Sequence, residues 1–402
     1  MKVLQVNTTV NRGSVGRHAE NVGKVLMENN HQSFIAYGRG KFVSQSNLVK
    51  VGGTFSQAWH LFQTRLFDRH GLASKYATKK MIEKVNAIDP DVVHLRNIHG
   101  YYLNYQVLFE YLKETNKPVV WTFHDCWPFT GHCSFFDRVN CFRWQSQCYD
   151  CPNLKGYPAS FMADRSRQNF SLKKQVFTSI KNLTIITPSD WLTSHVKSSF
   201  FRDFPAITIR NGIDISVFKP QDSTQIIETL QTKGYKIILG VANVWDPRKG
   251  LADFQALSQM IGKEFKIILV GLSEAQSKNL PQNIIPISHT NSIQELAAYY
   301  SLADVFINPT YADNFPTANL EALACGTPVV TYNTGGSPEA VDEHTGLVVE
   351  KGDVKGLAEA IKTITEKGKG NYQPLCRERA ERYFNKDERF MDYLRLYENI
   401  LK

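Results

Sequence analysis

Short apolar stretches alternate with amphipathic and polar stretches along the whole chain. The apolar stretches are rich in Val, Ile and Leu, which is typical of buried strands, and the stretches between them have the composition of helices and loops. This alternation predicts parallel sheets with helical crossovers and therefore an α/β fold. The predicted strands are Lys2–Val6, Pro90–Leu95, Pro118–Phe123, Leu183–Pro188, Ile207–Ile209, Lys236–Val241, Lys266–Gly271, Asp304–Asn308 and Pro328–Thr331.

The stretch Asn308–Val330 places the start of a helix in a loop between two of these strands. Pro316 is tolerated in the first turn of a helix, and the alanines and leucines that follow it are good helix formers. Gly326 and Pro328 end the helix before the next strand. Because a helix N-terminus presents free N–H groups and the positive end of the helix dipole, we expect it to bind an anion such as a phosphate.

Two carboxylates flank this expected anion site. Asp313 lies in the loop, and Glu321 lies on the helix eight residues further on. Carboxylates accept hydrogen bonds, so they suit the hydroxyl groups of a sugar and a ribose on either side of an anion. The alternative is an αβ unit of any Rossmann-like sheet, in which Glu321 is a solvated charge.

Asn308–Val330, together with Gly335–Val341 (GGSPEAV), resembles the donor-site signature of retaining glycosyltransferases of family 4. The family has two glutamates at the spacing that separates Asp313 from Glu321 here. Other landmarks follow along nearly the whole chain, including Asn211–Asp214 (NGID), which resembles the border between the two domains of the family. The resemblance implies the GT-B form of the α/β class, in which two Rossmann-like domains face each other across a cleft.

The resemblance also implies how the chain is divided. Residues 1–214 correspond to an acceptor-side domain, residues 215–385 to a domain that binds the nucleotide-sugar donor, and residues 386–402 to a helix that crosses back to the first domain. A length of 402 residues agrees with two domains rather than one.

Residues elsewhere in the chain complete the expected donor site. Arg248 and Lys249 stand at a predicted helix start, where they would hold a diphosphate and stabilise its charge as the glycosidic bond breaks. The loop that contains Gly13 lets the backbone approach a ligand, although a plain strand-to-helix turn is the alternative. From the resemblance, the expected catalytic residues are Asp313, Glu321, His124, Lys249 and Arg248, and the expected donor contacts are Gly13, Ser14, Asn243, Arg248, Lys249, Asn314, Phe315, Pro316, Thr317 and Glu321.

Two histidines follow predicted strands, at the edge of a parallel sheet where ligands bind. His124 matches the family histidine near the donor sugar. For His99, an acceptor-side contact and a structural hydrogen-bond partner are both open.

A cysteine-rich insertion occupies about residues 126–160. Four of its cysteines resemble the ligands of a structural Zn²⁺ site, and the last two of them are separated by two residues: Cys133, Cys141, Cys148 and Cys151. Reduced or buried thiols are the alternative, because the first two spacings are wider than in common zinc modules. The resemblance implies that catalysis itself requires no metal or other cofactor.

The net charge of +9 favours anionic partners such as nucleotide diphosphates and acidic lipid surfaces. No nucleic-acid partner is expected, because no familiar nucleic-acid module is present. The N-terminal residues MKVLQVNTTV form a predicted strand and lack the apolar core of a signal peptide, which favours the cytoplasm.

The stretch Trp59–Val85 predicts one or two helices that are both basic and aromatic. Its aromatic and aliphatic side chains fall at helical spacing, and its many lysines and arginines suit an anionic membrane surface. An ordinary helix with one core face and one solvated face is the alternative. The expected location is therefore the cytoplasm, peripheral on the inner face of the plasma membrane.

Together these features predict a retaining glycosyltransferase. It would move a sugar from a nucleotide-diphosphate donor, a UDP-sugar in preference to a GDP-sugar, to a hydroxyl of a glycan or lipid-linked oligosaccharide in the synthesis of a bacterial surface polysaccharide. The alternatives are a GT-B phosphorylase or epimerase and a nucleotide-sugar-binding module without turnover.

Overall fold

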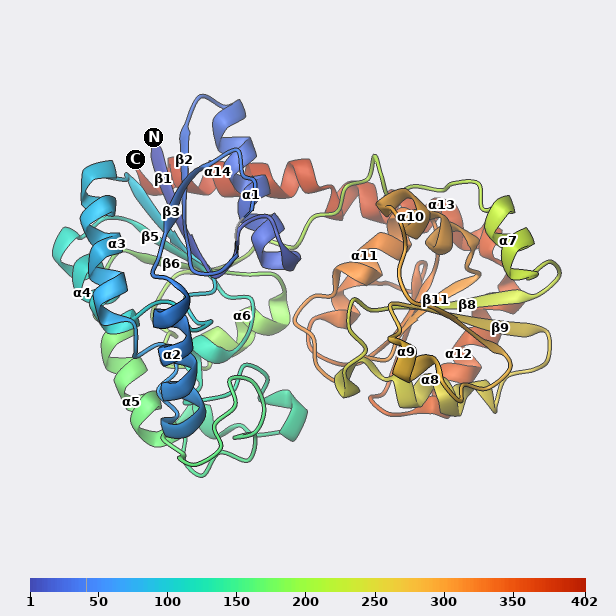
Figure 1. Ribbon diagram of the computed structural model, residues 1–402. Coiled ribbons are helices and arrows are strands. Elements are labelled where there is room, and N and C mark those ends of the chain that lie inside the picture. Colours follow the sequence, from blue (N-terminus) through green and yellow to red (C-terminus); the bar gives the residue numbers. More distant parts are fainter. Residues whose placement is uncertain (41) are drawn as a thin grey trace. The chain divides into compact units, whose positions relative to one another are not determined.

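The computed structural model describes residues 1–40 and 42–402. The chain forms two compact units (Figure 1). Unit 1 comprises Met1–Ile209 together with Phe390–Lys402, and unit 2 comprises Arg210–Arg389. The sequence placed the corresponding boundaries at residues 214 and 385.

Both units are built on parallel sheets, which confirms the predicted α/β class. In the described residues, unit 1 has a seven-stranded sheet of order β3-β2-β1-β4-β5-β6-β7, and unit 2 has a six-stranded sheet of order β10-β9-β8-β11-β12-β13. All the strand pairs run parallel. Helices lie in most of the connections between neighbouring strands, as is usual for parallel pairing.

The sheet of unit 1 begins with a strand that the sequence predicted, and its last strand along the chain is a short edge strand. Three 3₁₀ turns lie between β5 and α5, in the cysteine-rich segment. Its elements are β1 (Lys2–Asn7), α1 (Gly13–Glu28), β2 (Gln32–Tyr37), β3 (Asn47–Lys50), α2 (Thr54–Phe67), α3 (Lys75–Ile88), β4 (Val92–Leu95), α4 (Tyr105–Thr115), β5 (Val119–Thr122), α5 (Ser166–Phe177), β6 (Leu183–Thr187), α6 (Asp190–Lys197) and β7 (Ala206–Thr208).

Unit 2 repeats the same alternation of strands and helices. The 3₁₀ turns η4 (Pro247–Lys249) and η5 (Ser337–Ala340) follow β8 and β12. The other elements are α7 (Thr224–Leu230), β8 (Lys236–Val241), α8 (Leu251–Ser258), β9 (Phe265–Val270), α9 (Glu274–Ser277), β10 (Ile284–Ile287), α10 (Ile293–Leu302), β11 (Val305–Asn308), α11 (Thr317–Ala324), β12 (Val329–Tyr332), β13 (Gly346–Val349), α12 (Val354–Lys367) and α13 (Lys369–Phe384).

The last helix, α14 (Lys386–Ile400), begins in unit 2 and ends in unit 1. Its residues Phe390, Tyr393, Leu394 and Tyr397 are buried in one cluster with side chains of β1, α1, β4, β5 and β6. The second hydrophobic cluster of unit 1 contains residues of α3, α4 and α5, so helices cover both faces of the sheet (Figure 1). In the described residues, no helix is long and apolar enough to cross a membrane.

Buried polar groups tie α14 to the sheet of unit 1. The ring of His94 on β4 contacts the Tyr397 hydroxyl through Nδ1 at 2.5 Å and the Thr122 hydroxyl through Nε2 at 2.8 Å. Next to it, the buried guanidinium of Arg96 donates from Nε to Gln5 Oε1 at 2.9 Å. Burial and the positive charge of Arg96 hold the pKa of His94 well below its ordinary value, so this histidine is neutral at pH 7.

A second buried histidine supports the loop between α2 and α3. His60 Nδ1 lies 2.9 Å from Ser74 Oγ, and His60 Nε2 accepts the backbone N–H of Gly71 at 2.9 Å. An acceptor nitrogen cannot carry a proton, so the ring is neutral. Burial lowers the pKa of His60 from 6.5 to about 3.

Stability should therefore fall as the pH drops below about 6.5. In that range the unfolded chain protonates His60 and His94 while the folded chain does not, so unfolding takes up protons. Each such histidine should contribute a slope of roughly 1.4 kcal/mol per pH unit. The free energy of unfolding, measured by urea denaturation between pH 7.5 and 5.0, checks this expectation.

His60→Gln should lower the stability at pH 7.5 but reduce its pH dependence, because glutamine does not titrate. The exposed His344, changed to Gln, is the matched control and should leave the slope unchanged. An identical pH dependence in the His60→Gln variant and the unchanged protein would contradict the assignment.

Candidate functional site

Each unit has one position where the strand order reverses. In unit 2 the chain runs from β8 outward to β10 and then returns to β11 on the other side of β8. In unit 1 it runs from β1 outward to β3 and returns to β4 beside β1. The loops after the two central strands diverge at such a point and leave a crevice at their carboxyl ends. Most of the expected site residues come from these loops and from the elements that follow them, whereas His124 follows β5, the neighbour of β4.

In unit 2 the loop after β8 is fastened to the loop after β11 through Arg248. The Arg248 guanidinium donates to the carbonyl of Ala312 at 2.9 Å, and the Arg248 carbonyl accepts the N–H of Tyr311 at 2.7 Å. Asp246 orients the arginine, because its carboxylate accepts the Arg248 backbone N–H at 2.9 Å and Nε at 3.1 Å. This guanidinium is therefore held in a fixed position at the reversal point.

The two loops also meet through a pair of opposite charges. Lys249 Nζ lies 2.7 Å from Asp313 Oδ2, and Arg248 Nη1 lies 3.8 Å from the same oxygen. The side chains of Lys249 and Asp313 are each 20% exposed, so the pair is partly screened from water but open to a ligand. The structure thus brings together three of the residues that the sequence singled out for the donor sugar and its diphosphate.

The start of α11 lies directly after Asp313. Pro316 occupies the N-cap position, and this residue makes no side-chain cap hydrogen bond. Asn319 holds the helix in place: its Oδ1 accepts from Asn308 at 2.8 Å, and its Nδ2 donates to the carbonyl of Ser337 at 3.4 Å. The backbone N–H of Asn319 already donates to the carbonyl of Pro316 at 3.2 Å, and the start of the helix before it suits an anion.

Asn314 and Phe315, two further expected contacts, are largely buried beside this helix start, and Thr317 is half-buried in its first turn. The Phe315 carbonyl accepts a hydrogen bond from Asn211 at 3.1 Å. Asn243, by contrast, is exposed in the loop after β8.

Glu321 lies one turn further along α11, where it faces α10. Its Oε2 accepts a hydrogen bond from the hydroxyl of Tyr300 at 2.8 Å. Burial, reinforced by this carboxylate, raises the pKa of Tyr300, so the hydroxyl stays protonated and donates. Tyr300 therefore fixes the orientation of the carboxylate.

In unit 1, α1 begins directly after β1 at the reversal point. Gly13 has a φ of +67° and, with Ser14, is exposed in the first turn. Its N-cap residue, Arg12, makes no side-chain cap hydrogen bond, and the first turn holds no acidic residue.

His124 follows β5, the strand next to β4 in the sheet. Burial and the charge of Arg96 lower the pKa of His124 to about 3. A neutral imidazole of this kind exchanges hydrogen bonds with hydroxyl groups but carries no positive charge at pH 7.

His99, after β4, pairs with Asp125, after β5. His99 Nε2 lies 3.0 Å from Asp125 Oδ2, and Asp125 Oδ1 accepts the backbone N–H of Trp127 at 2.9 Å. Burial opposes ionisation of Asp125, but His99, the N–H of Trp127 and the nearby His124 together outweigh it and lower the pKa of this carboxyl. The carboxylate therefore fixes the orientation of the His99 ring.

Comparisons with known proteins identify the family. Residues 15–217 match the model described as Glycosyltransferase Family 4, and residues 235–367 match the model described as Glycosyl transferases group 1. The chain belongs to glycosyltransferase family 4.

Among curated relatives of this glycosyltransferase is the putative colanic acid biosynthesis glycosyl transferase WcaC of Escherichia coli, which is 25% identical over the full length of both chains. The capsular polysaccharide biosynthesis glycosyltransferase CapM of Staphylococcus aureus is 27% identical over 38% of this chain and 43% of its own.

Solved structures share the fold at low identity. The sucrose-phosphate synthase of Thermosynechococcus elongatus has a TM-score of 0.72 at 18% identity and covers 99% of this chain and 98% of its own. HepE of Anabaena, solved in complex with UDP, has a TM-score of 0.70 at 13% identity over 99% of this chain and 100% of its own. The fold of the glycosyltransferase is therefore GT-B, as expected.

Sequence reasoning missed several partners of the expected residues. Asp246 and Tyr300 were not singled out, although each fixes an expected site residue. The pairing of His99 with Asp125 was also missed. A signal for it existed, because both residues directly follow predicted strands, and neighbouring parallel strands end at the same edge of a sheet.

The cysteine-rich segment lies between β5 and α5 of the glycosyltransferase. Cys133 is buried near Cys151, and Cys148 Sγ accepts the backbone N–H of Gly131 at 3.2 Å. Thiols are suitable zinc ligands. Nevertheless, across the described residues no group of three or more His, Cys, Asp or Glu side chains is arranged to hold a metal ion. The geometry does not support the zinc site, which stays a prediction from the spacing of Cys133, Cys141, Cys148 and Cys151.

Metal analysis of protein purified without chelator tests this prediction. The cysteine spacing predicts about one zinc ion per chain. Cys148→Ser and Cys151→Ser should lose it, whereas Cys325→Ser, a buried cysteine of unit 2, should retain it. Protein without zinc would show that these thiols are simply reduced and that the spacing was misleading.

Proposed function

We propose that this glycosyltransferase transfers a sugar from a UDP-sugar to a hydroxyl of a glycan or lipid-linked oligosaccharide, with retention of the anomeric configuration. The observation that carries the proposal is the arrangement at the reversal point of unit 2. There Arg248 is held by Asp246, Lys249 pairs with Asp313, and α11 begins without a side-chain cap. Cations and free N–H groups at one crevice suit a sugar diphosphate.

Each group has a role in this reaction. Arg248, Lys249 and the first turn of α11 bind the diphosphate and stabilise the charge that develops on it as the glycosidic bond breaks. Glu321, oriented by Tyr300, accepts from the ribose hydroxyls. Asp313 accepts from a hydroxyl of the donor sugar, while its charge holds Lys249 in place.

Unit 1 supplies the other expected contacts, because we assign it to the acceptor and unit 2 to the donor. Gly13 and Ser14, at the uncapped start of α1, add N–H groups for the diphosphate. His124, neutral at pH 7, hydrogen-bonds the donor sugar. These assignments follow the family resemblance, and the position of each residue at the carboxyl edge of its sheet supports them.

Retention follows if the acceptor attacks from the face that the diphosphate leaves. The bond between the anomeric carbon and the diphosphate oxygen breaks, and a bond to the acceptor oxygen forms on the same face. The proton of the acceptor hydroxyl passes to the leaving phosphate oxygen, so the step requires no covalent enzyme intermediate.

The named relatives guide the choice of donor and acceptor. HepE has been solved with UDP and with UDP-glucose, which favours a uridine donor here. WcaC and CapM carry names from colanic acid and capsular polysaccharide biosynthesis, which favours an acceptor in surface polysaccharide synthesis. Thermal stabilisation by a panel of UDP- and GDP-sugars identifies the donor, since a ligand stabilises the fold that binds it.

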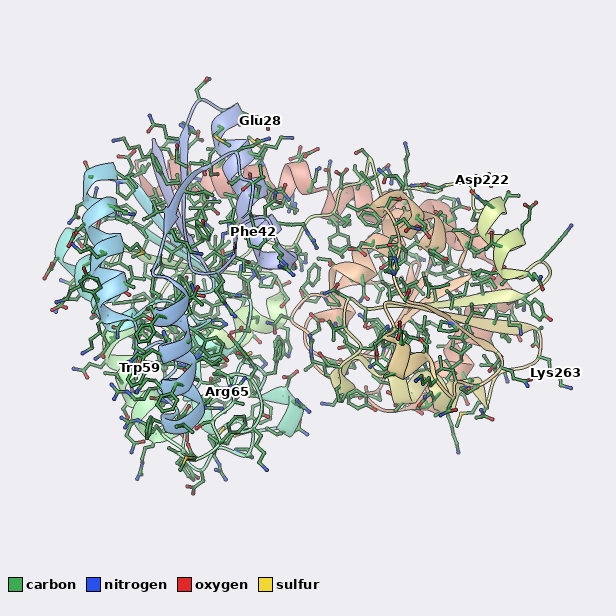
Figure 2. The ribbon with its side chains drawn as sticks, in the orientation of Figure 1. Glu28, Phe42, Trp59, Arg65, Asp222 and Lys263 are labelled. Atoms are coloured by element: carbon green, nitrogen blue, oxygen red, sulfur yellow. The ribbon has the colours of Figure 1, made fainter. Side chains whose placement is uncertain are left out.

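Lys249→Ala and Glu321→Ala should each reduce kcat/KM about a hundredfold, which corresponds to about 3 kcal/mol of lost transition-state stabilisation. The measurement is release of nucleoside diphosphate that depends on the acceptor. Lys263→Ala changes an exposed lysine between α8 and β9 and serves as the matched control (Figure 2). Near-normal activity of both site variants, with folding verified by circular dichroism, would refute the donor site.

We also infer that the protein works in the cytoplasm, attached to the inner face of the plasma membrane through α2 and α3. The positions that α2 buries are polar, His60 and Thr64, whereas Phe55, Trp59 and Phe67 are 88%, 51% and 44% exposed. From the sequence, this stretch could either pack against the core with one face or contact a membrane. A helix that buries polar side chains and exposes aromatic ones is suited to contact with a membrane surface, since exposed aromatic clusters mark interaction surfaces.

Attachment of this kind should be reversible and sensitive to salt. The protein should sediment with vesicles that contain phosphatidylglycerol at low ionic strength and be released at high ionic strength, because each basic side chain near an anionic surface contributes roughly 1 kcal/mol. Reversing the charges of Arg65, Arg69, Lys79 and Lys80 to Glu should weaken sedimentation without changing affinity for the donor. If the unchanged protein does not sediment with such vesicles at low ionic strength, the proposed attachment is wrong.

A further inference from the structure

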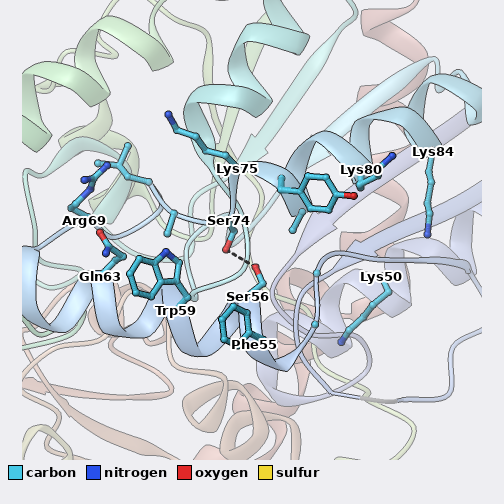
Figure 3. Close-up of a pocket in the computed structure, with 16 residues that line it drawn as sticks. Lys50, Phe55, Ser56, Trp59, Gln63, Arg69, Ser74, Lys75, Lys80 and Lys84 are labelled. Atoms are coloured by element: carbon cyan, nitrogen blue, oxygen red, sulfur yellow. Dashed lines mark hydrogen bonds between the residues drawn. The ribbon is translucent and has the colours of Figure 1, made fainter.

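A groove runs between α2 and α3 of unit 1, well apart in the chain from the loops assigned to the donor. We call it the α2/α3 groove (Figure 3). Its volume is about 790 Å³, which lies in the range of pockets that hold small organic ligands. Ser56 of α2 donates a hydrogen bond to Ser74, which precedes α3, at 3.2 Å, and this bond joins the two walls.

Positive charge surrounds the groove. Five cationic side chains line it, and no acidic side chain does so among the described residues: the five are Lys50, Arg69, Lys75, Lys80 and Lys84. Lys80 has a partner in Glu83 at 2.9 Å. In the described residues, no carboxylate lies within 4.0 Å of the charged groups of Arg69, Lys75 or Lys84. Like charges that converge on one hollow repel each other, and an anion relieves that repulsion.

Aromatic side chains occupy the middle of the groove. In Figure 3, Lys50, Lys80 and Lys84 lie on one side, Arg69 and Gln63 lie on the other, and Phe55 and Trp59 lie between them. The side chain of Phe55 is 88% exposed, that of Trp59 is 51% exposed, and Tyr76 at the α3 wall is 74% exposed. A small inorganic anion gains nothing from this apolar surface, whereas a ligand with both an anionic and an apolar part uses all of it.

We propose that the α2/α3 groove binds one molecule of a lipid phosphate, meaning an amphiphile in which a phosphate ester is joined to an apolar chain. The phosphate lies among Lys50, Lys80 and Lys84, and the chain lies over Phe55 and Trp59. The proposal deepens the membrane attachment proposed above and rests on it for the source of the ligand. That source is either a glycerophospholipid of the bilayer or the prenyl phosphate of a lipid-linked acceptor.

Titration calorimetry with soluble amphiphiles below their micelle concentrations tests the groove in the absence of any membrane. The probes are dihexanoyl phosphatidic acid for the glycerolipid source and farnesyl phosphate for the prenyl source. Dihexanoyl phosphatidylcholine, which has no net charge, and inorganic phosphate, which has no chain, are the controls. We expect one molecule of at least one probe to bind per chain, at least about tenfold more tightly than either control. The tighter probe identifies the source.

Matched variants locate the ligand. Lys84→Ala and Trp59→Ala should each weaken binding of the better probe about tenfold, because one removes a charged contact and the other removes apolar contact area. Lys79→Ala and Phe67→Ala change an exposed lysine of α3 and an exposed aromatic of α2 that do not line the groove, and they should leave the affinity unchanged.

Three results would overturn the proposal: no binding of either probe, inorganic phosphate binding as tightly as the probes, or equal losses in the groove variants and their controls. If vesicles sediment the protein while neither probe binds, the membrane attachment stands and the lipid-phosphate site fails. If a probe binds with the expected variant pattern but the vesicles do not, the groove site stands and the attachment fails.

Discussion

Close backbone approach at two glycines controls the geometry of the donor-side unit. A side-chain carbon at Gly250 would lie 2.3 Å from the carbonyl oxygen of Pro309, and one at Gly335 would lie 1.7 Å from that of Asp313. Both glycines also have positive φ values, +75° and +57°, which disfavour any other residue. The loops after β8, β11 and β12 therefore contact one another backbone to backbone. The contacts among Arg248, Lys249 and Asp313 depend on this approach, because each joins one of these loops to another.

A buried carboxylate also supports the loops around the site. Asp253 of α8 accepts hydrogen bonds from Tyr311 and Tyr332, each at 3.1 Å, so the loop after β11 is joined to both α8 and β12. Burial raises the pKa of the Asp253 carboxyl, while the two hydroxyls favour its ionised form. The charge on a bound diphosphate changes during the reaction. Hydrogen-bonded groups such as Asp253 hold the surrounding loops in place, so these loops do not have to reorganise as that charge changes.

Unit 1 combines a closely packed sheet with a helix, α2, whose aromatic side chains are exposed. Near β4 and β5, Arg96 is hydrogen-bonded to the buried His18, and the buried His94 is hydrogen-bonded to Tyr397 of α14. These contacts and the apolar cluster around them hold α14 against the sheet. The helix α2 contributes polar residues to the interior and aromatic residues to the surface. Exposed aromatic rings add little to folding stability, so their position on α2 is better explained by a partner or a lipid surface than by the stability of the unit. The positive charges of α3 and of the α2/α3 groove point to the same kind of partner.

The sequence alone determined the class of fold and supplied the residues of the proposed donor site. Strands in the middle of each sheet are buried on both faces, so they appear as continuous apolar runs, and each of the predicted strands is present in the structure. The strands that were missed, β2, β3, β10 and β13, include three at sheet edges, where partial exposure breaks up the apolar run. A local pattern records how deeply a segment is buried, not what it faces. That Lys249 meets Asp313, that Glu321 meets Tyr300, and that α2 turns its aromatic side outward depend on how distant segments pack, and only the tertiary structure decided them.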